Sequence, residues 1–503
     1  MQRIRLMCAA LAAAIWLAGC AGSQTGAEIP AVQSSGTIEL IYNDPLAVSR
    51  PKNSCETEAC QRLLELIEGA EHTIDLAAYG TRDQTELLEA LERAQERGVR
   101  VRLVFDRDSE GRNYYTSTEE WEARLGGSVT DYEYTVRHKE REAQRSRPEP
   151  RCERPEGFEG PLSCFALDFG DRWLLAGHAS IEDFTAEEHG GGMDPIMHHK
   201  FAVIDERWVW TGSSNFSNSG TGGYNFNVVV VSDSPEIARL FSREFALMYE
   251  EERFHSDKPP SDIRPIQLEN AEAVVLFSPQ DDAMRAAVET LIHRAQERID
   301  VTIFFLTHVR VTAALIDAHL RGVEVRVIVD ATSAENGYTK HEILREAGIA
   351  VKVEDWGGKM HAKAAAIDGE FVVAGSMNWT SAGDRTNDEN TIMLRSTELA
   401  AGFHDTFDYL WDTIDERWAE LGARPLPESW DSGTSCTDGV DNDFSGLVDD
   451  EDPGCSEEGR PSAPLPPHRF LPRDENPESL GYRIQRSEPC DPDAPAWWMC
   501  DSP

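Results

Sequence analysis

Positively charged residues are scarce in this sequence. Its 503 residues include 48 Lys and Arg against 90 Asp and Glu, so the formal net charge is −42. Proteins that bind nucleic acid through its phosphates need clustered Lys and Arg, so this balance argues against a general nucleic-acid binder and leaves room only for a local basic groove. Hydrophobic residues at 40% and charged residues at 27% are typical of globular proteins. We expect two or three domains over this length.

The N-terminus lacks an apolar run long enough to anchor the chain in a bilayer. The run over 6–17 follows two arginines and has the length of a signal peptide. The segment Leu-Ala-Gly-Cys that ends at Cys20 resembles the lipobox of bacterial lipoproteins, in which that cysteine is lipidated. We therefore expect a signal peptide over 1–19, a tether over 20–38, and an exported bacterial lipoprotein of the outer membrane, periplasmic or on the cell surface. An ordinary secretory signal with an incidental cysteine is the alternative.

Cysteines are few, and most of them lie in close couples. Eight of the ten remain once Cys8, in the predicted signal, and Cys20 are set aside. An even number in an exported protein is typical of disulfides, whereas zinc, the alternative, needs a four-ligand spacing that is lacking here. The couples expected to form disulfides are Cys55/Cys60, Cys152/Cys164, Cys436/Cys455 and Cys490/Cys500.

One structural unit occurs twice along the chain. An apolar strand pattern over 73–80 is followed by an amphipathic helix pattern and a second strand that ends at Asp106. The same order recurs from 299–307 to a strand that ends at Asp330. Short apolar strands that alternate with helices predict an α/β fold with β-α-β units and a parallel or mixed sheet. The two halves are expected to span 39–258 and 265–425, joined by a polar, Pro-rich segment.

The first half contains an insertion between Asp106 and His198. It includes the basic run 137–156 and the couple Cys152/Cys164. The run is either a solvated surface loop stapled by a disulfide, or a rim that attracts anionic headgroups or polyanions.

Each half carries one copy of the motif H-x-K-x4-D-x6-G-S-x-N at identical spacing. The first copy consists of His198, Lys200, Asp205, Ser213 and Asn215, and the second of His361, Lys363, Asp368, Ser376 and Asn378. In a strand, the His and Lys two residues apart project from one face. The G-S-x-N turn can offer a hydroxyl, an amide and backbone N–H groups to an oxyanion.

This set of groups suits phosphodiester exchange. One neutral histidine attacks phosphorus, and the other, protonated, donates to the leaving oxygen. Lys200 and Lys363 neutralise the non-bridging oxygens, and the Ser and Asn side chains add hydrogen bonds. We expect Asp205 and Asp368 to belong to the catalytic set as well. Because side chains supply the positive charge, we expect no cofactor for catalysis.

The two motifs resemble those of the phospholipase D superfamily over roughly residues 39–420. The resemblance implies two α/β units related by a pseudo-twofold axis, a shared cleft and a phosphohistidine intermediate. It also implies that Glu389 orients His361, whereas the matching position in the first half is Phe226, flanked by Asn225 and Asn227. Family habit favours His198 as the nucleophile, while these local residues favour His361.

We expect an enzyme, a phospholipase D-type phosphodiesterase that releases phosphatidic acid or transfers the phosphatidyl group to an alcohol. Its partner would be the phospholipid membrane, and a monomer suffices because both motifs lie in one chain. The alternatives are a metal-independent endonuclease, for which the run 137–156 would be the groove, and a cardiolipin synthase-like phosphatidyltransferase. A binding protein without activity is disfavoured, because no motif residue is missing.

An Asp-rich loop and a polar tail follow the second half. The segment 431–456 has oxygen-bearing side chains at EF-hand-like spacing, which predicts a structural calcium ion, and its alternative is an acidic linker. The ligand positions are Asp441, Asp443, Ser445, Asp449 and Asp452. We expect an irregular tail over 457–503, whose Trp497 and Trp498 either pack back on the protein or touch lipid.

Overall fold

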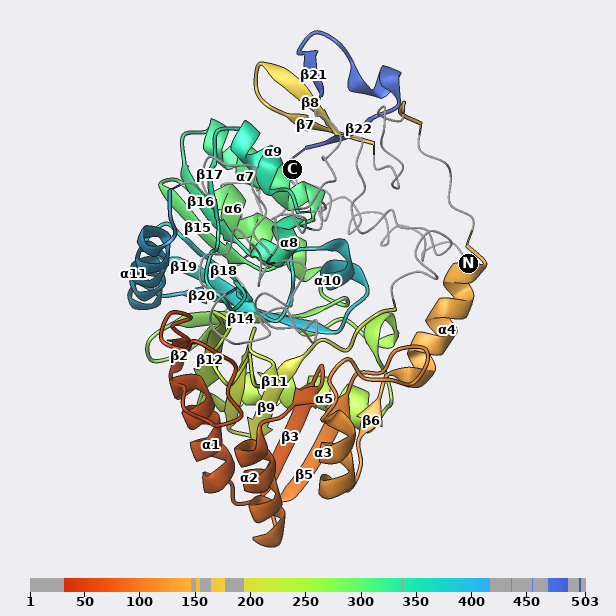
Figure 1. Ribbon diagram of the computed structural model, residues 1–503, viewed down its shortest axis with the longest axis vertical. Helices are drawn as coiled ribbons and strands as arrows, with labels where there is room; N and C mark the ends of the chain where they lie inside the picture. The colour runs from red at the N-terminus through yellow and green to blue at the C-terminus, as the bar shows by residue number, and fades with distance from the viewer. Residues whose placement is uncertain are drawn as a thin grey trace, which may run out of the picture.

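The computed structural model describes residues 31–145, 151–153, 164–176, 194–335, 339–416, 436, 455, 469–486 and 497–498. Within them, two large mixed sheets with helices around them make up the body of the molecule (Figure 1). A smaller four-stranded sheet lies at one end of the long axis (Figure 1).

The first half is built on a seven-stranded sheet. Its order is β2-β12-β10-β9-β3-β5-β6. The strands are β2 (Ile38–Tyr42), β3 (Thr73–Ala78), β5 (Arg100–Phe105), β6 (Val129–Thr130), β9 (Lys200–Ile204), β10 (Trp208–Gly212) and β12 (Val228–Ser232). The helices are α1 (Glu58–Gly69), α2 (Thr85–Glu96), α3 (Thr118–Leu125), α4 (Tyr132–Ala143) and α5 (Pro235–Tyr249). The short strands β4 (Thr81–Arg82) and β11 (Phe216–Ser217) pair separately.

The second half is built on a nine-stranded sheet of order β1-β13-β14-β20-β19-β18-β15-β16-β17. Its strands are β1 (Val32–Gln33), β13 (Ile266–Gln267), β14 (Glu272–Ser278), β15 (Arg298–Ile303), β16 (Glu324–Val329), β17 (Ala350–Val353), β18 (Lys363–Ile367), β19 (Phe371–Gly375) and β20 (Glu389–Arg395). Its helices are a π-helical turn (Met284–Glu289), α6 (Thr290–Arg294), α7 (Val309–Leu320), α8 (Ala331–Glu335), α9 (His341–Glu346), α10 (Ser381–Arg385) and α11 (Thr397–Thr413).

The two sheets share one plan. In each, the motif strand (β9 or β18) pairs antiparallel with the first β-α-β strand (β3 or β15), which pairs parallel with the second (β5 or β16). On the other side of each motif strand the order also matches, with β10, β12 and β2 in the first half at the places of β19, β20 and β14 in the second. The predicted duplicated α/β fold is confirmed, and its sheets are mixed because each motif strand runs opposite to its β-α-β neighbour.

Helix α5 joins the cores of the two halves. Ser234 caps it by accepting a hydrogen bond from the Ile237 N–H, and Pro235 occupies its first turn. Its buried face includes Phe241, whose ring lies edge-on to Phe277 of the second half at 5.2 Å. One apolar cluster therefore extends across both sheets and holds the two motif strands in a fixed relation.

The structure departs from the expected tether and from the surface-loop interpretation of the basic run. Residues 32–33, placed in the tether, form β1 and pair parallel with β13 at the edge of the second sheet. Helix α4 occupies 132–143, so the first part of the basic run is helical rather than a loop. A helix can form here because the run contains neither Gly nor Pro before residue 148. Most of the residues of this helix are exposed.

The predicted irregular tail contains regular structure. Its strands β21 (Arg469–Pro472) and β22 (Arg483–Gln485), separated by a 3₁₀ turn over Pro477–Leu480, pair with β8 (Arg172–Ala176) and β7 (Phe165–Asp168) of the insertion. Alternating burial explains the pairing, since Leu471 is buried between exposed neighbours. Trp498 is buried and Trp497 stacks on Phe371, so the tryptophans pack back on the protein.

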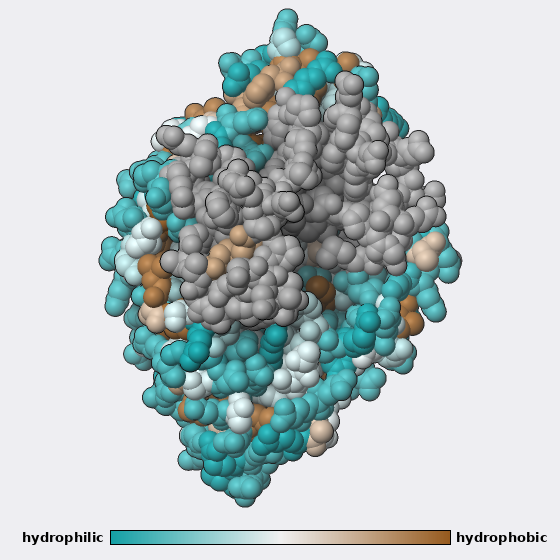
Figure 2. Space-filling model, in the orientation of Figure 1, coloured by the Kyte–Doolittle hydropathy of each residue, from teal (hydrophilic) through white to brown (hydrophobic). Residues whose placement is uncertain are grey.

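Three of the four predicted disulfides are present, Cys55–Cys60, Cys152–Cys164 and Cys436–Cys455. Cys490 and Cys500 lie outside the described residues, as does Cys20. None of the described helices has the length and apolar character to cross a membrane. The surface over the first half, at the lower end of the view, is largely hydrophilic (Figure 2).

Candidate active site

The two motif strands present equivalent histidines and lysines. Lys200 and Lys363 begin β9 and β18, each motif histidine lies two residues earlier, and all four side chains are buried. Each lysine Nζ donates to the carbonyl oxygen of its own histidine, at 2.5 Å for Lys200 and 2.6 Å for Lys363. The strand alternation therefore directs imidazole and ammonium to the same face, as the spacing predicts.

Each histidine is held by the opposite half of the molecule. The His198 N–H donates to the Asp388 carbonyl oxygen at 3.0 Å, and the His361 N–H donates to the Phe226 carbonyl oxygen at 3.0 Å. Parallel bridges between Met197 and Asp388, and between Phe226 and Met360, flank these bonds. The two motifs thus meet at the interface between the halves.

The side chains that orient the two imidazoles differ. His198 Nδ1 lies 2.8 Å from both carboxylate oxygens of Glu389, and His361 Nδ1 lies 3.0 Å from Asn227 Oδ1. The expectation that Glu389 orients His361 is wrong. The bridges carry each post-motif segment across the interface, so Glu389 reaches the histidine of the other half. His198 has the charged partner and His361 has a neutral one. Phe226 corresponds to Asp388, so the counterpart of Glu389 in the first half is Asn227 and not the predicted Phe226.

The motif serines hold these orienting groups. Ser376 Oγ donates to Glu389 Oε2 at 2.7 Å, and Ser213 Oγ donates to Asn227 Oδ1 at 3.0 Å. The backbone N–H groups of both serines are bound to strand carbonyls. We therefore assign the serines to positioning instead of the direct phosphate contact that the sequence predicts.

The motif asparagines each leave an amide oxygen, an acceptor atom, without a partner among the described residues. Asn215 Nδ2 donates to the Tyr115 hydroxyl at 3.0 Å. The Oδ1 atoms of Asn215 and Asn378 are buried and accept no hydrogen bond from the described residues. A buried polar atom without a partner is costly, so a ligand group that donates there would be favoured.

The two motif aspartates lie away from the imidazoles, at the other end of their strands. Asp205 accepts hydrogen bonds at 2.8 Å from the N–H groups of Glu71, His72 and Thr73. Asp368 accepts equivalent bonds from Gln296, Glu297 and Arg298. Both have positive φ angles, 52° and 51°, which aspartate tolerates in tight turns. We assign them a structural role, contrary to the catalytic role expected from sequence.

Burial and mutual repulsion dominate the electrostatics of the site. Burial lowers the pKa of Lys200 to about 7, and burial together with Lys200 lowers the pKa of Lys363 well below its usual value. Burial and the two lysines lower the pKa of both motif histidines. A bound anion would relieve this repulsion, so the pocket is suited to a phosphodiester.

A buried polar chain lies behind His198. His199 Nε2 lies 3.0 Å from Glu244, which pairs with Lys258, and Lys258 Nζ lies 2.6 Å from Asp388. Asp388 also pairs with His255, whose Nε2 lies 3.0 Å from Asp131. This network of buried side chains fixes the segment that carries Glu389. Sequence reasoning missed it, because His255 and Lys258 lie at the very end of the predicted first half, beside the polar, Pro-rich join, and belong to no motif.

An aromatic ring stands beside each motif histidine. The ring of Tyr79 lies 5.3 Å from that of His198, and the ring of Phe304 lies 4.9 Å from that of His361. Both residues directly follow the first strand of a β-α-β unit, so the repeat itself is the sequence signal that could have located them.

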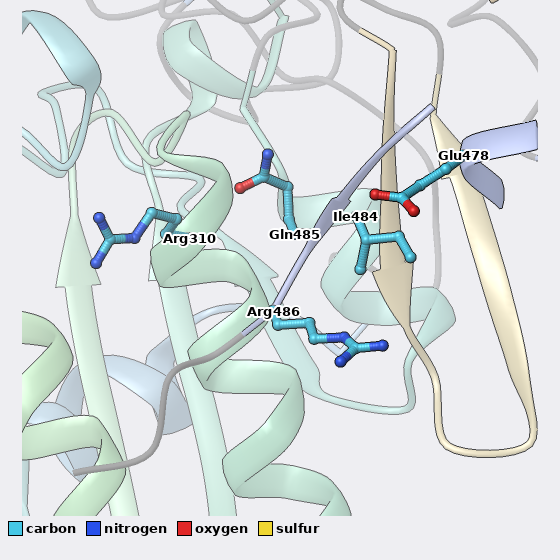
Figure 3. Close-up of a pocket in the computed structure, with 5 residues that line it drawn as sticks. All are labelled: Arg310, Glu478, Ile484, Gln485 and Arg486. Carbon is cyan, nitrogen blue, oxygen red and sulfur yellow. The ribbon is translucent and has the colours of Figure 1, made fainter. Parts of the chain in front are cut away.

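Metal-binding clusters are not found among the described residues. The predicted calcium ligands, Asp441, Asp443, Ser445, Asp449 and Asp452, lie outside them. A cavity of about 480 Å³ between α7 and β22 is separate from the motifs and is lined by Arg310, Glu478, Ile484, Gln485 and Arg486. The two arginines point in opposite directions, so the lining does not converge on one ligand (Figure 3).

Comparisons with known proteins agree with this arrangement. The family model described as "Cardiolipin synthase, PLD-like domain" matches residues 63–146, 172–249 and 288–411, more than half of the chain. A mitochondrial cardiolipin hydrolase of Chlamydomonas reinhardtii is 36% identical over 118 residues, which cover 24% of this chain and 53% of that protein. A phospholipase D of Rickettsia bellii is 32% identical over 151 residues, 29% of this chain and 75% of that protein. The chain thus spans about half the length of the first of these relatives.

A solved structure extends the likeness to the whole fold. The phosphatidylserine synthase of Haemophilus influenzae superposes with a TM-score of 0.50 and 14% identity, covering 79% of this chain and 91% of that one. The superposition supports the two-unit fold with its pseudo-twofold relation.

Proposed function

Because this chain belongs to the PLD-like domain family, within the phospholipase D superfamily, we propose that it is a phosphodiesterase that cleaves phospholipids to phosphatidic acid. The observation that carries this proposal is the pair of buried His-Lys sets, held across the interface at one site. Each set offers an imidazole for covalent or acid–base chemistry and an ammonium group for a non-bridging oxygen.

His198 is the nucleophile in the proposed first step. Its Nδ1–H donates to Glu389, which leaves Nε2 with a lone pair for attack on phosphorus. A bond forms between Nε2 and phosphorus, and the phosphorus–oxygen bond to the headgroup breaks. The leaving oxygen takes a proton from His361 Nε2. Lys200 and Lys363 stabilise the negative charge on the non-bridging oxygens.

The second step releases the product. His361, now neutral, removes a proton from water as the water oxygen attacks phosphorus. The nitrogen–phosphorus bond breaks, and phosphatidic acid and free His198 result. An alcohol in place of water gives phosphatidyl transfer through the same intermediate, which is the activity named for the phosphatidylserine synthase neighbour.

Membrane lipid is favoured over nucleic acid as the substrate. The net charge of −42 opposes binding of a long polyanion, and the predicted lipidation at Cys20 would hold the enzyme beside its substrate at the outer membrane. A monomer suffices, and a calcium ion in the loop between Cys436 and Cys455 would be structural. An endonuclease remains the second candidate because α4 carries basic residues of the run 137–156.

The test uses the purified chain with Cys20→Ala, which cannot be lipidated, in excess chelator. Vesicles of phosphatidylcholine, phosphatidylethanolamine or phosphatidylglycerol are offered, with single-stranded DNA as a control. We expect phosphatidic acid, intact DNA, and a loss of roughly 10³-fold or more in His198→Ala and in His361→Ala. Cut DNA with intact lipid would make the protein an endonuclease, and near-normal turnover in either variant would contradict a shared site.

A further inference from the structure

The two ends of the candidate site are not alike, and one residue accounts for much of the difference. Lys359 precedes the second motif by two residues, at the place that Ile196 occupies before the first. The inference drawn from this difference rests on the proposed function, because it concerns the substrate of the same site.

Lys359 and Ile196 are equivalent in the fold. The Lys359 N–H donates to Asn225 Oδ1 at 3.0 Å, and the Ile196 N–H donates to Asn387 Oδ1 at 3.1 Å. The Lys359 carbonyl accepts from Phe226 N–H at 2.8 Å, and the Ile196 carbonyl accepts from Asp388 N–H at 2.9 Å. The pseudo-twofold relation is thus kept in the backbone and broken in the side chain.

The side chain of Lys359 lies beside the second histidine. Its Nζ is 5.5 Å from the centroid of the Phe304 ring, and Lys363 Nζ is 5.0 Å from the same centroid. The His361 ring lies 4.9 Å from that of Phe304. Two ammonium groups and an imidazole therefore surround one aromatic ring, and the charge of Lys359 acts on both His361 and Lys363.

The position of Lys359 is fixed by its backbone. Gly358 lets the chain approach the first half closely, since a Cβ atom there would lie 1.9 Å from the Tyr224 carbonyl oxygen. Lys359 itself is half-buried, and the contact of its Nζ within the described part of the chain is the one with the Phe304 ring. The charge of Lys359 acts on the buried carboxyl group of Asp330, but burial still raises the pKa of Asp330 above its usual value. Burial likewise raises the pKa of its neighbour Glu354.

The equivalent end of the first half is lined by aromatic rings and has Ile196 in place of Lys359, while Lys200 Nζ lies 5.5 Å from the centroid of the Tyr79 ring. Tyr79, the counterpart of Phe304, stacks on Tyr114 at 5.8 Å and meets Tyr115 edge-on at 5.8 Å. Tyr114 is 70% exposed. This end offers tyrosine rings to a glycerol or acyl segment, whereas the end beside His361 offers an additional positive charge.

We propose that Lys359 is a second anion subsite on the leaving-group side, so that the preferred substrate is a phospholipid whose leaving group carries its own phosphate. His361 protonates the leaving oxygen in the proposed reaction, and Lys359 stands next to His361. When the phosphorus–oxygen bond breaks, the departing alcohol keeps its own phosphodiester anion, which Lys359 holds. One added lysine fits one added anion, whereas a nucleic acid strand would need cations along a continuing path.

The experiment compares cardiolipin, whose leaving group is anionic, with phosphatidylglycerol, whose leaving group is neutral glycerol. Both are presented to the full chain in detergent micelles brought to equal surface charge with oleate. We expect Lys359→Gln to lower kcat/KM for cardiolipin about tenfold and to change that for phosphatidylglycerol less than about twofold. Lys359→Arg, which keeps the charge, should retain most of the cardiolipin activity.

The matched control is Lys52→Gln, which removes a lysine paired with Glu56 on the surface. It should leave kcat/KM for both substrates unchanged and so exclude a general effect of net charge. An equal loss for both lipids in Lys359→Gln, or none for either, would overturn the subsite while leaving the proposed function intact. A wild-type chain that cuts DNA and neither lipid would overturn the proposed function, and with it the subsite.

Discussion

Glu389 makes the two motif histidines chemically different. It lies 2.8 Å from His198 Nδ1, while Asn227 takes the equivalent place 3.0 Å from His361 Nδ1. A carboxylate stabilises the positive charge that His198 acquires as its Nε2 bonds to phosphorus, and an amide oxygen does so less. A neutral partner leaves His361 readier to release its proton. In the proposed mechanism, the two residues thus divide the roles of nucleophile and acid.

The ionisation of Glu389 sets the acid limb of the predicted pH dependence. Burial raises its pKa to about 7, against the opposing charge of Lys200 and the hydrogen bond from Ser376. Below that pH the carboxyl group is protonated and no longer accepts the Nδ1–H as an anion, so kcat/KM should fall as the pH drops below about 7. Glu389→Gln should lower kcat roughly 10³-fold and remove this acid limb from the pH profile. An unchanged limb in that variant would assign it to another group.

At the scale of elements, the motif aspartates fasten the turns at the far ends of β9 and β18. Each carboxylate satisfies three successive backbone N–H groups at the start of the neighbouring strand, β3 or β15. The motif therefore combines residues for chemistry with a residue for folding. A strand of five residues places its two ends about 15 Å apart, so the aspartate at one end lies far from the histidine and lysine at the other.

Asp205→Ala should destabilise the fold and spare the chemistry. We expect a loss of about 1–3 kcal/mol in the free energy of unfolding and a change in kcat of less than about twofold. Burial opposes the charged form of Asp205, but the backbone N–H groups outweigh it and lower its pKa. Its contribution is therefore present above the unfolded-chain pKa of about 3.9 and lost as the pH falls through the lowered folded value.

The matched control is Asp262→Ala, which removes an exposed carboxylate paired with Arg264. It should change the free energy of unfolding, measured by denaturant titration, by less than about 0.5 kcal/mol. A folded Asp205→Ala chain with little activity would return that residue to the catalytic set.

Local pattern was enough to predict some elements and not others. The alternation of strands and helices around Asp106 and Asp330 predicts both β-α-β units, because these contacts are close in sequence. Strands β21 and β22 pair with β8 and β7 about 300 residues earlier, and nothing in their short, charged segments indicates a partner. The assignment of Glu389 to the wrong histidine has the same origin, since only the interface decides which half its side chain reaches.

At the scale of the whole molecule, two copies of one unit have diverged around a shared centre. The strand order and backbone hydrogen bonds repeat, whereas Glu389 is replaced by Asn227, and Lys359 by Ile196, at the equivalent positions of the other half. Duplication builds the site, and the departures from symmetry give the substrate a direction within it. In the proposed mechanism, both halves are therefore required for a single turnover.

Trapping the covalent intermediate tests this account most directly. The leaving group of bis(4-nitrophenyl) phosphate needs no acid. With this substrate, the His361→Asn variant can still be phosphorylated on His198, but it lacks the base that activates water. Mass spectrometry of its quenched digest should locate a nitrophenyl phosphate on the peptide that contains His198, and His198→Asn should carry none. A phosphorylated His361 in the His198→Asn chain would contradict the assigned roles, and the absence of any adduct in both variants would contradict the phosphohistidine mechanism.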